Sequence, residues 1–171
     1  KKEIQQKIIE KKEVNNKVPD EEFYAILRLV SPGTSLRTAL DGIVSSGKGA
    51  LIVAENEELI PIIDGGFKVN AKFSAQKLVE LSKMDGAIVL SKDMKRINVV
   101  NVQLSPSIRI KTSETGTRHK AAERTAKQIG SLVIAVSERK KEITIFYKNR
   151  KHVLKSTSDI LRRSSENIQI L

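Results

Sequence analysis

The sequence predicts a single α/β domain in which helices cover both faces of a mixed β-sheet. Apolar residues make up 39% of the 171 residues and charged residues 30%, which is the balance of a globular protein with its own core. Segments with the apolar spacing of a helix are interspersed with short apolar runs that are typical of strands. No internal repeat or low-complexity linker divides the chain. These observations favour one domain over residues 20–171, preceded by a charged N-terminal arm over residues 1–19.

The first part of this domain is predicted to be helical. Residues 1–17 are rich in Lys, Glu, Gln and Asn, so we expect them to lie outside the core as the arm. A helix over residues 21–30 can start at Pro19, and the Ser-Pro-Gly-Thr segment at 31–34 ends it. Thr34 or Ser35 then caps a second helix. The apolar face of this second helix holds Leu36, Leu40, Ile43 and Val44.

From residue 49 onward, strands enter the pattern. The continuous apolar run at 50–54 lies between a glycine and a charged turn, as expected for a buried strand. A short turn or helix follows, and then residues 64–67, which contain two glycines and are expected to form a loop. The remaining predicted elements are a helix at 74–82, a strand at 87–90 with 97–104 as its hairpin partner, a helix at 117–129, strands at 132–137, 143–147 and 151–154, and a helix at about 158–170.

The composition limits the classes of function. The chain has no cysteine, which excludes disulfides, thiolate chemistry and cysteine-ligated zinc. No apolar run reaches the roughly 18–20 residues that a membrane span needs, and no signal peptide is visible. We therefore expect a cytoplasmic protein with no membrane contact within this chain, although an anchor in an upstream segment stays open.

The formal charge of +11 favours anionic partners. A solvated basic surface and a field that attracts polyphosphates explain this charge about equally well. A dedicated nucleic-acid surface comes third, because aromatic residues make up only 4% of the chain, tryptophan is absent and acids are interleaved with the basic residues. Nucleic acid is therefore not an expected partner for this chain alone.

Three basic side chains, Arg118, His119 and Lys120, lie in the first turn of the predicted helix 117–129. A helix N-terminus carries roughly half a positive charge, so each cation there costs about 0.3–1 kcal/mol unless an anion neutralises it. The backbone N–H groups at the same end also lack partners. A phosphate would satisfy both, so we interpret residues 112–120 as an anion site. The alternative is a solvated helix start that Glu114 and Glu123 balance.

A second cluster, Asp85-Gly86-Ala87, places a carboxylate and a glycine where a strand begins. Because Gly86 has no side chain, a ligand could approach the backbone closely at this point. On the residues alone, the cluster is either an acidic site or a plain turn between a helix and a strand.

Several motifs together resemble the diadenylate cyclase domain family, and most closely its DNA-integrity-scanning branch. They are residues 81–87 with Asp85-Gly86-Ala87, Asn101-Val102-Gln103-Leu104, residues 113–119 with Thr115-Gly116-Thr117-Arg118-His119, and the supporting segments 31–34, 64–67, 122–128 and 136–139. The resemblance covers roughly residues 28–170. It implies a twisted mixed sheet flanked by helices, and an enzyme that condenses two ATP molecules into cyclic di-AMP with release of two pyrophosphates.

The same resemblance implies the partners. Each subunit is expected to hold one ATP, and two subunits meet face to face to complete the site, so the chain should form at least a homodimer. Cyclic di-AMP is two-fold symmetric, and an isologous dimer can supply two identical half-sites for it. The expected cofactor is Mg²⁺ or Mn²⁺, both of which prefer oxygen ligands and bridging phosphates.

By resemblance, Asp85 is a catalytic residue that contacts the ribose hydroxyl and helps to hold the metal. Thr117, Arg118, His119 and Lys120 are expected to bind the triphosphate. His119 is also assigned a catalytic role and a place at the metal.

The rest of the expected site comes from the neighbouring strand ends. Gly86 and Ala87 border the ribose or the base, and Leu104 contacts adenine unless it is a plain core leucine. After the strand at 132–137, Ser137 and Arg139 bind phosphate and Glu138 binds metal, with a plain turn as the alternative. Residues 64–66 shape a loop that borders the site. His152 receives no role.

The sequence departs from the family pattern at two site positions. Lys120 stands where arginine is usual, which keeps the charge but loses the bidentate geometry of a guanidinium. Ala121 stands where a hydroxyl residue is frequent, which removes one phosphate contact. The segment 105–111 is also more basic and poorer in proline than expected. These departures leave a second hypothesis open, a non-catalytic module that binds nucleotides or nucleic acid.

Overall fold

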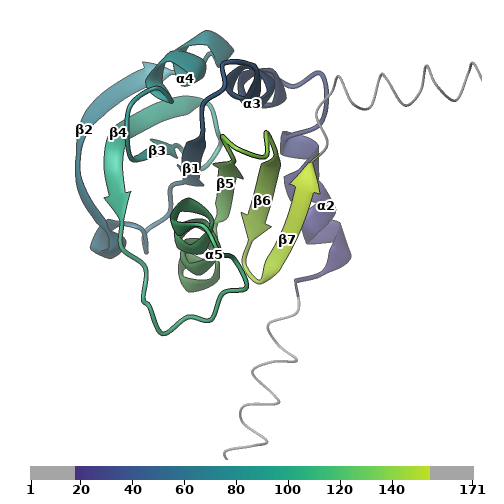
Figure 1. Ribbon diagram of the computed structural model, residues 1–171, viewed down its shortest axis with the longest axis vertical. Helices are drawn as coiled ribbons and strands as arrows, with labels where there is room; N and C mark the ends of the chain where they lie inside the picture. The colour runs from purple at the N-terminus through teal and green to yellow at the C-terminus, as the bar shows by residue number, and fades with distance from the viewer. Residues whose placement is uncertain (1–17, 155–171) are drawn as a thin grey trace, which may run out of the picture.

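A computed structural model describes residues 18–154, which form one seven-stranded sheet with helices on both faces (Figure 1). The strands are β1 (Ala50–Ala54), β2 (Ile63–Lys72), β3 (Ala87–Leu90), β4 (Arg96–Leu104), β5 (Leu132–Val136), β6 (Ile143–Tyr147) and β7 (Arg150–Leu154). Their order across the sheet is β2-β4-β3-β1-β5-β6-β7. The pair β1–β3 is parallel and the other neighbouring pairs are antiparallel, so the predicted mixed α/β class is confirmed.

The helices of the described residues are α2 (Asp20–Leu29), α3 (Ser35–Ser45), α4 (Ala75–Leu81) and α5 (Thr117–Ile129), with a short 3₁₀ turn, η1 (Ile60–Ile62). Helix α3 is capped as predicted, because the Thr34 hydroxyl accepts a hydrogen bond of 3.2 Å from the backbone N–H of Arg37. Ser74 caps α4 in the same way through the N–H of Lys77. In Figure 1, α5 lies in front of the centre of the sheet and α2 lies beside β7.

Two apolar layers hold these helices against the sheet. Because side chains alternate along a strand, Ile52 and Ala54 of β1 join the layer that α3 and α4 cover, whereas Leu51 and Val53 join the layer under α5. All five residues of β1 are buried, which is why its sequence is a continuous apolar run and not an alternating one. The layer under α5 is built from Ala122, Ala126 and Ile129 of that helix.

The sheet edge differs from the sequence prediction. The segment 64–67, expected to be a loop, belongs to the ten-residue edge strand β2, which pairs with β4. The sequence does not indicate this strand, because two glycines are typical of a loop and the strand lacks a buried apolar run. Gly65 and Gly66 have positive φ angles (+68° and +81°), and most of the strand is exposed. The predicted arm at 1–17 and the predicted helix at 158–170 lie outside the described residues. Within the described part, no helix is long and apolar enough to cross a membrane.

Candidate active site

An open cavity of about 1080 Å³ lies at one end of the strands of the sheet. Six segments line it, and each one begins or ends a strand or a helix: residues 48–51, 64–66, 82–87, 101–104, 116–121 (without Lys120) and 137–139. The volume is close to the upper end of small-molecule and cofactor pockets, which are roughly 300–1,000 Å³. The two clusters that the sequence singled out, Asp85-Gly86-Ala87 and Thr117-Arg118-His119, therefore line the same cavity.

The N-terminus of α5 opens into this cavity without a local anion. Its N-cap residue is Gly116, no side chain among the described residues caps it, and its first turn holds no acid. Its first backbone N–H groups therefore stay available to a ligand. This end of the helix thus combines free donors with the cation Arg118 and the imidazole of His119.

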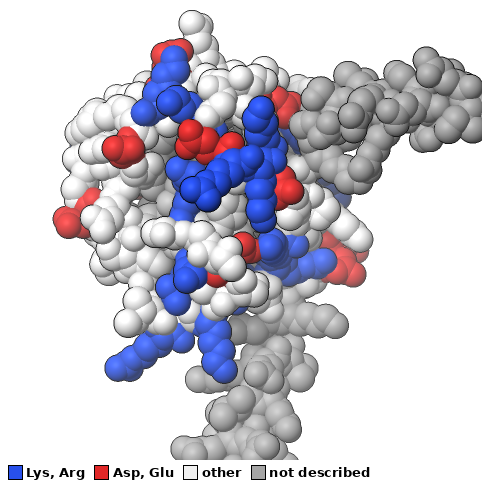
Figure 2. All heavy atoms as spheres, viewed as in Figure 1, with Lys and Arg blue, Asp and Glu red and all other residues white. Residues whose placement is uncertain are grey.

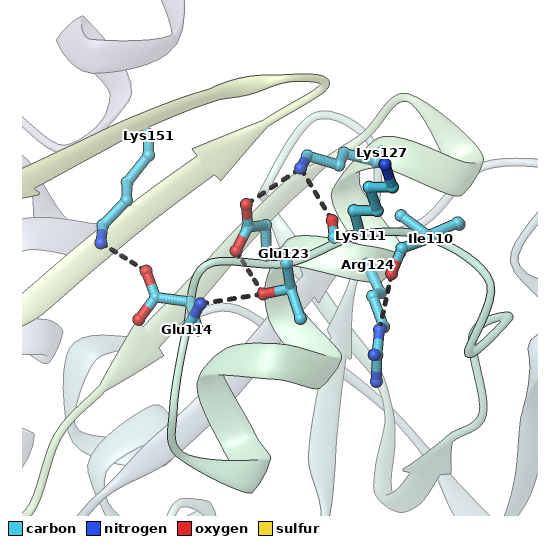
Figure 3. A network of polar contacts seen from close by, with 8 residues as sticks. Ile110, Lys111, Glu114, Glu123, Arg124, Lys127 and Lys151 are labelled. Atoms are coloured by element: carbon cyan, nitrogen blue, oxygen red, sulfur yellow. Dashed lines mark hydrogen bonds and ion pairs between the residues drawn. The ribbon is translucent and has the colours of Figure 1, made fainter.

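The two acids that could have balanced those groups are engaged elsewhere (Figure 3). Glu114 forms an ion pair with Lys151 of β7. Glu123 accepts a 2.5 Å hydrogen bond from Thr112 and pairs with Lys127 at 3.0 Å. Burial alone would raise the pKa of Glu123, but the hydrogen bonds from Thr112 and Lys127 lower it on balance. Both acids therefore have other partners, although Glu114 still acts electrostatically on His119, so a helix start balanced by these acids stays an alternative.

Arg118 is held between two strands at the cavity wall. Its Nη1 donates a 3.3 Å hydrogen bond to the carbonyl of Val136 at the end of β5. The same guanidinium lies against the backbone of Gly49, just before β1, so closely that a Cβ there would be 2.1 Å from Nη1. A glycine at position 49 is thus what leaves room for this arrangement.

His119, the next residue of α5, is partly buried. Its ring packs edge-on against Phe146 of β6, with 6.4 Å between ring centroids and an interplanar angle of 77°. Burial lowers the pKa of His119 below its ordinary value of 6.5, and the cations Arg118, Lys151 and Lys140 lower it further against the opposing effect of Glu114. The imidazole is therefore neutral at pH 7, the form that accepts hydrogen bonds or coordinates a metal.

Asp85 lies in the turn between α4 and β3 and is exposed to the cavity. Its carboxylate makes no hydrogen bond or ion pair with any described residue, so it is free to meet a ligand. The next residue, Gly86, has a φ of +86°, and a Cβ there would lie 2.8 Å from the carbonyl oxygen of Val102 in β4. Only glycine fits at this position, because both its φ angle and its contact with β4 exclude a side chain.

The other predicted site residues divide into two groups. Those that line the cavity besides Asp85, Thr117, Arg118 and His119 are Gly86, Ala87, Leu104, Ser137, Glu138 and Arg139. Leu104 is half-buried and also packs on the layer under α5, so both of its predicted roles remain compatible with its position. Lys120 is absent from the cavity lining, although it follows His119 in the helix.

The family model described as "DisA bacterial checkpoint controller nucleotide-binding", abbreviated DAC, matches residues 37–151. The chain belongs to the DAC family. It is 46% identical over 153 residues to the DNA integrity scanning protein DisA of Acetivibrio thermocellus, which covers 89% of this chain and 42% of that protein. It is 49% identical over 146 residues to DisA of Clostridioides difficile, covering 85% and 41%. The chain thus spans about two-fifths of the length of these relatives.

Two solved structures share the fold of this DAC domain. A Bacillus cereus protein described as a hypothetical membrane spanning protein superimposes with a TM-score of 0.64 and 27% identity, over 78% of this chain and 70% of that one. DacA from Staphylococcus aureus, solved as a double cysteine mutant, gives a TM-score of 0.59 and 23% identity over 77% and 91%. At that identity, the second comparison supports the fold alone.

The predicted metal ligands of the DAC domain do not form a cage within one subunit. Among residues 18–154, no group of three or more His, Cys, Asp or Glu side chains could hold a metal ion, so Asp85, His119 and Glu138 do not converge. Mg²⁺, however, usually keeps several waters and binds through one or two carboxylates plus substrate phosphates. The unpaired carboxylate of Asp85 fits an ion of that kind, which a nucleotide would help to coordinate.

Sequence reasoning missed several residues of the DAC cavity. Lys48 and Gly49 line it because β1 begins there, and Asn101 and Gln103 line it although the motif at 101–104 yielded only Leu104 as a candidate. The sequence signal that could have indicated the contact with Arg118 was the glycine that stands directly before a buried strand.

Figure 2 shows basic and acidic side chains intermixed on the face that it displays, so that face carries no patch of one sign.

Proposed function

We propose that this chain is a diadenylate cyclase, which condenses two ATP molecules into cyclic di-AMP and two pyrophosphates at a site that two face-to-face subunits complete. The observation that carries the proposal is the cavity that the unpaired carboxylate of Asp85 shares with the uncapped N-terminus of α5. Membership of the DAC family and similarity to DisA proteins support it.

In this proposal, the helix end binds the triphosphate. Free N–H groups of α5, the Thr117 hydroxyl and the Arg118 guanidinium donate hydrogen bonds to phosphate oxygens. The neutral imidazole of His119 donates its one N–H to a phosphate oxygen. Lys48 and Arg139, which also line the cavity, add positive charge for an anionic substrate.

The reaction consists of two direct displacements, in which each bound nucleotide attacks the other. The 3′-oxygen of one ATP forms a bond to the α-phosphorus of the other, its proton passes to water, and the bond from that phosphorus to the pyrophosphate oxygen breaks. The same displacement in the opposite direction closes the ring and releases the second pyrophosphate. Asp85 holds the attacking hydroxyl in line and favours the loss of its proton. A bound Mg²⁺ or Mn²⁺ would supply charge neutralisation at the phosphates, with Asp85 as its protein ligand.

One subunit offers one Asp85 and one phosphate-binding helix end. The product needs two of each in a two-fold arrangement, which an isologous dimer provides. The cavity is open, so a second subunit can face it. We therefore infer that the reactive pair forms between subunits, each of which holds one ATP.

The decisive experiment incubates the protein with ATP and either Mg²⁺ or Mn²⁺ and separates the products by chromatography. We expect cyclic di-AMP, with a specific activity that falls on dilution as half-sites separate. No product with either metal at high protein concentration would defeat the proposal. Binding of DNA or RNA that weakens steeply with salt, without ATP turnover, would instead favour the non-catalytic binding module.

The Asp85→Asn variant tests the role of the acid. We expect turnover to fall by roughly 10²–10⁴-fold, the usual contribution of a group that acts on the reacting proton. The fold should persist, because no described residue bonds to this carboxylate. Asp64→Asn is the matched control, since Asp64 lines the same cavity from β2 and loses the same charge. Equal rates for the two variants would remove Asp85 from the chemistry.

A further inference from the structure

Asn101 occupies a bulge in β4 beside the acid of the proposed active site. Ala87 of β3 pairs with Val102 of β4, and Val89 pairs with Val99, so one residue of β3 faces two residues of β4. Asn101 is one of those two, and its φ is +57°. Asparagine tolerates this left-handed conformation better than most residues, so the backbone explains part of its presence.

The side chain of Asn101 also bonds to the segment that carries Asp85. Its Nδ2 donates a 2.8 Å hydrogen bond to the backbone carbonyl of Asp85, sixteen positions earlier in the chain. Among the described residues, no other side chain bonds to Asp85. Asp85 belongs to no helix or strand, and the left-handed Gly86 follows it. The hydrogen bond from the Asn101 amide therefore fixes the peptide between Asp85 and Gly86.

The bulge itself is held from both sides. A Cβ on Gly86 would lie 2.8 Å from the carbonyl oxygen of Val102 and 3.0 Å from the carbonyl carbon of Asn101. On the other side, a Cβ on Gly66 of β2 would lie 2.8 Å from the carbonyl oxygen of Val100. Because two glycine backbones pack directly on this part of β4, Asn101 projects from a closely packed support.

We propose that Asn101 is a positioning residue, whose side-chain amide fixes the Asp85 peptide so that the Asp85 carboxylate meets the attacking hydroxyl. The expected effect on turnover rests on the proposed cyclase function. The hydrogen bond between Asn101 and Asp85 does not depend on that function.

Asn70 provides a matched control in the same sheet. It also has a positive φ, +48°, and also lies at a register shift, between Lys68 and Ala71 of β2. Its side chain makes no hydrogen bond to a described residue, and it does not line the cavity. Asn70→Gly and Asn101→Gly therefore make the same chemical change in similar backbone, and glycine keeps the left-handed conformation available in both.

The first measurement does not depend on activity. The Gly86 nitrogen shares a peptide with the carbonyl that Asn101 bonds, so ¹⁵N relaxation of Gly86 reports on how well that peptide is held. We expect greater mobility of Gly86 in Asn101→Gly and in Asn101→Asp, which keeps the size but lacks the N–H donor. Asn70→Gly should leave Gly86 unchanged. Unchanged Gly86 mobility in the Asn101 variants would overturn the proposal.

The second measurement separates positioning from general stability. We expect kcat of Asn101→Gly to fall roughly 10- to 100-fold, because a displacement of about 1 Å at a reacting group costs on this order, while ATP affinity at α5 changes little. Asn70→Gly should keep both values. Raised Gly86 mobility with an unchanged kcat would also overturn the proposal. If the unaltered protein makes no cyclic di-AMP, the cyclase proposal fails, and Gly86 mobility alone decides whether Asn101 fixes Asp85.

Discussion

The two walls of the cavity are built in different ways. The helix wall, residues 116–119, is one continuous segment at the start of α5. The strand wall consists of residues 64–66, 85–87 and 101–104, which come from β2, the β3 turn and β4. The helix wall offers free N–H groups and positive charge, whereas the strand wall offers the carboxylates of Asp64 and Asp85 on closely packed backbone. The proposed anion site is therefore formed by one local segment, while the placement of the acid depends on the pairing of three separate segments.

This difference predicts which property a substitution in each wall will change. Changes in the helix wall remove donors or charge and should weaken ATP binding with little effect on folding. Changes at the closely packed glycines of the strand wall, Gly66 and Gly86, disturb backbone contacts with β4 and should reduce stability together with turnover.

The largest effect on stability is expected for Gly86→Ala. The left-handed conformation costs an alanine roughly 1–2 kcal/mol, and the 2.8 Å approach to the Val102 carbonyl adds about 1–3 kcal/mol of overpacking. Gly33→Ala isolates the first cost, because Gly33 has a φ of +94° and nothing within 4 Å of its Cβ position. Urea unfolding should therefore show a clearly larger loss of unfolding free energy for Gly86→Ala. Equal losses would mean that the contact with β4 is unimportant.

Arg118→Ala should have the largest effect on the helix wall. Loss of charge-assisted hydrogen bonds to phosphate costs about 1.5–3 kcal/mol, so the Kd for ATP should rise by roughly 10- to 100-fold. Lys120→Ala is the control, since it removes the same charge from the same helical turn at a residue outside the cavity lining. Calorimetric titration with ATP measures both values.

Similar Kd values for these two variants would contradict the distinction between them. In that case the general field of the helix start would bind the nucleotide, and direct contact with Arg118 would not be needed.

The same contrast explains what could be predicted from the sequence. The prediction of an anion site over residues 112–120 needed only the order of the residues, because helix ends expose donors whatever the tertiary fold. The strand β2 was missed, since Gly65 and Gly66 are typical of a loop and only pairing with β4 makes the segment a strand. The contact between Asn101 and Asp85 was also beyond reach, because it depends on a bulge whose position follows from strand register. Nor did the sequence indicate that Lys120 lies outside the cavity lining.

A smaller effect on affinity should come from Gly49→Ala. The added methyl group displaces the end of the Arg118 side chain, which is flexible, so binding should weaken by less than in Arg118→Ala while the fold is kept. In the Arg118→Ala background, the same change should add almost nothing, because the residues act through one contact. A double-mutant cycle on the Kd for ATP tests this. Additive effects would show that Gly49 acts independently of Arg118.

The smallest effect concerns protonation of His119. Because burial and nearby cations lower its pKa below 6.5, the folded state resists protonation, and His119 contributes stability above pH 6.5 that is lost as the pH falls through its folded pKa. An NMR titration should find the lowered pKa, and His119→Gln should reduce the acid loss of stability more than His152→Gln on β7 does. Bound ATP should raise the His119 pKa, since phosphate charge at the start of α5 favours the imidazolium. If ATP binds and leaves that pKa unchanged, the triphosphate does not lie against the helix wall.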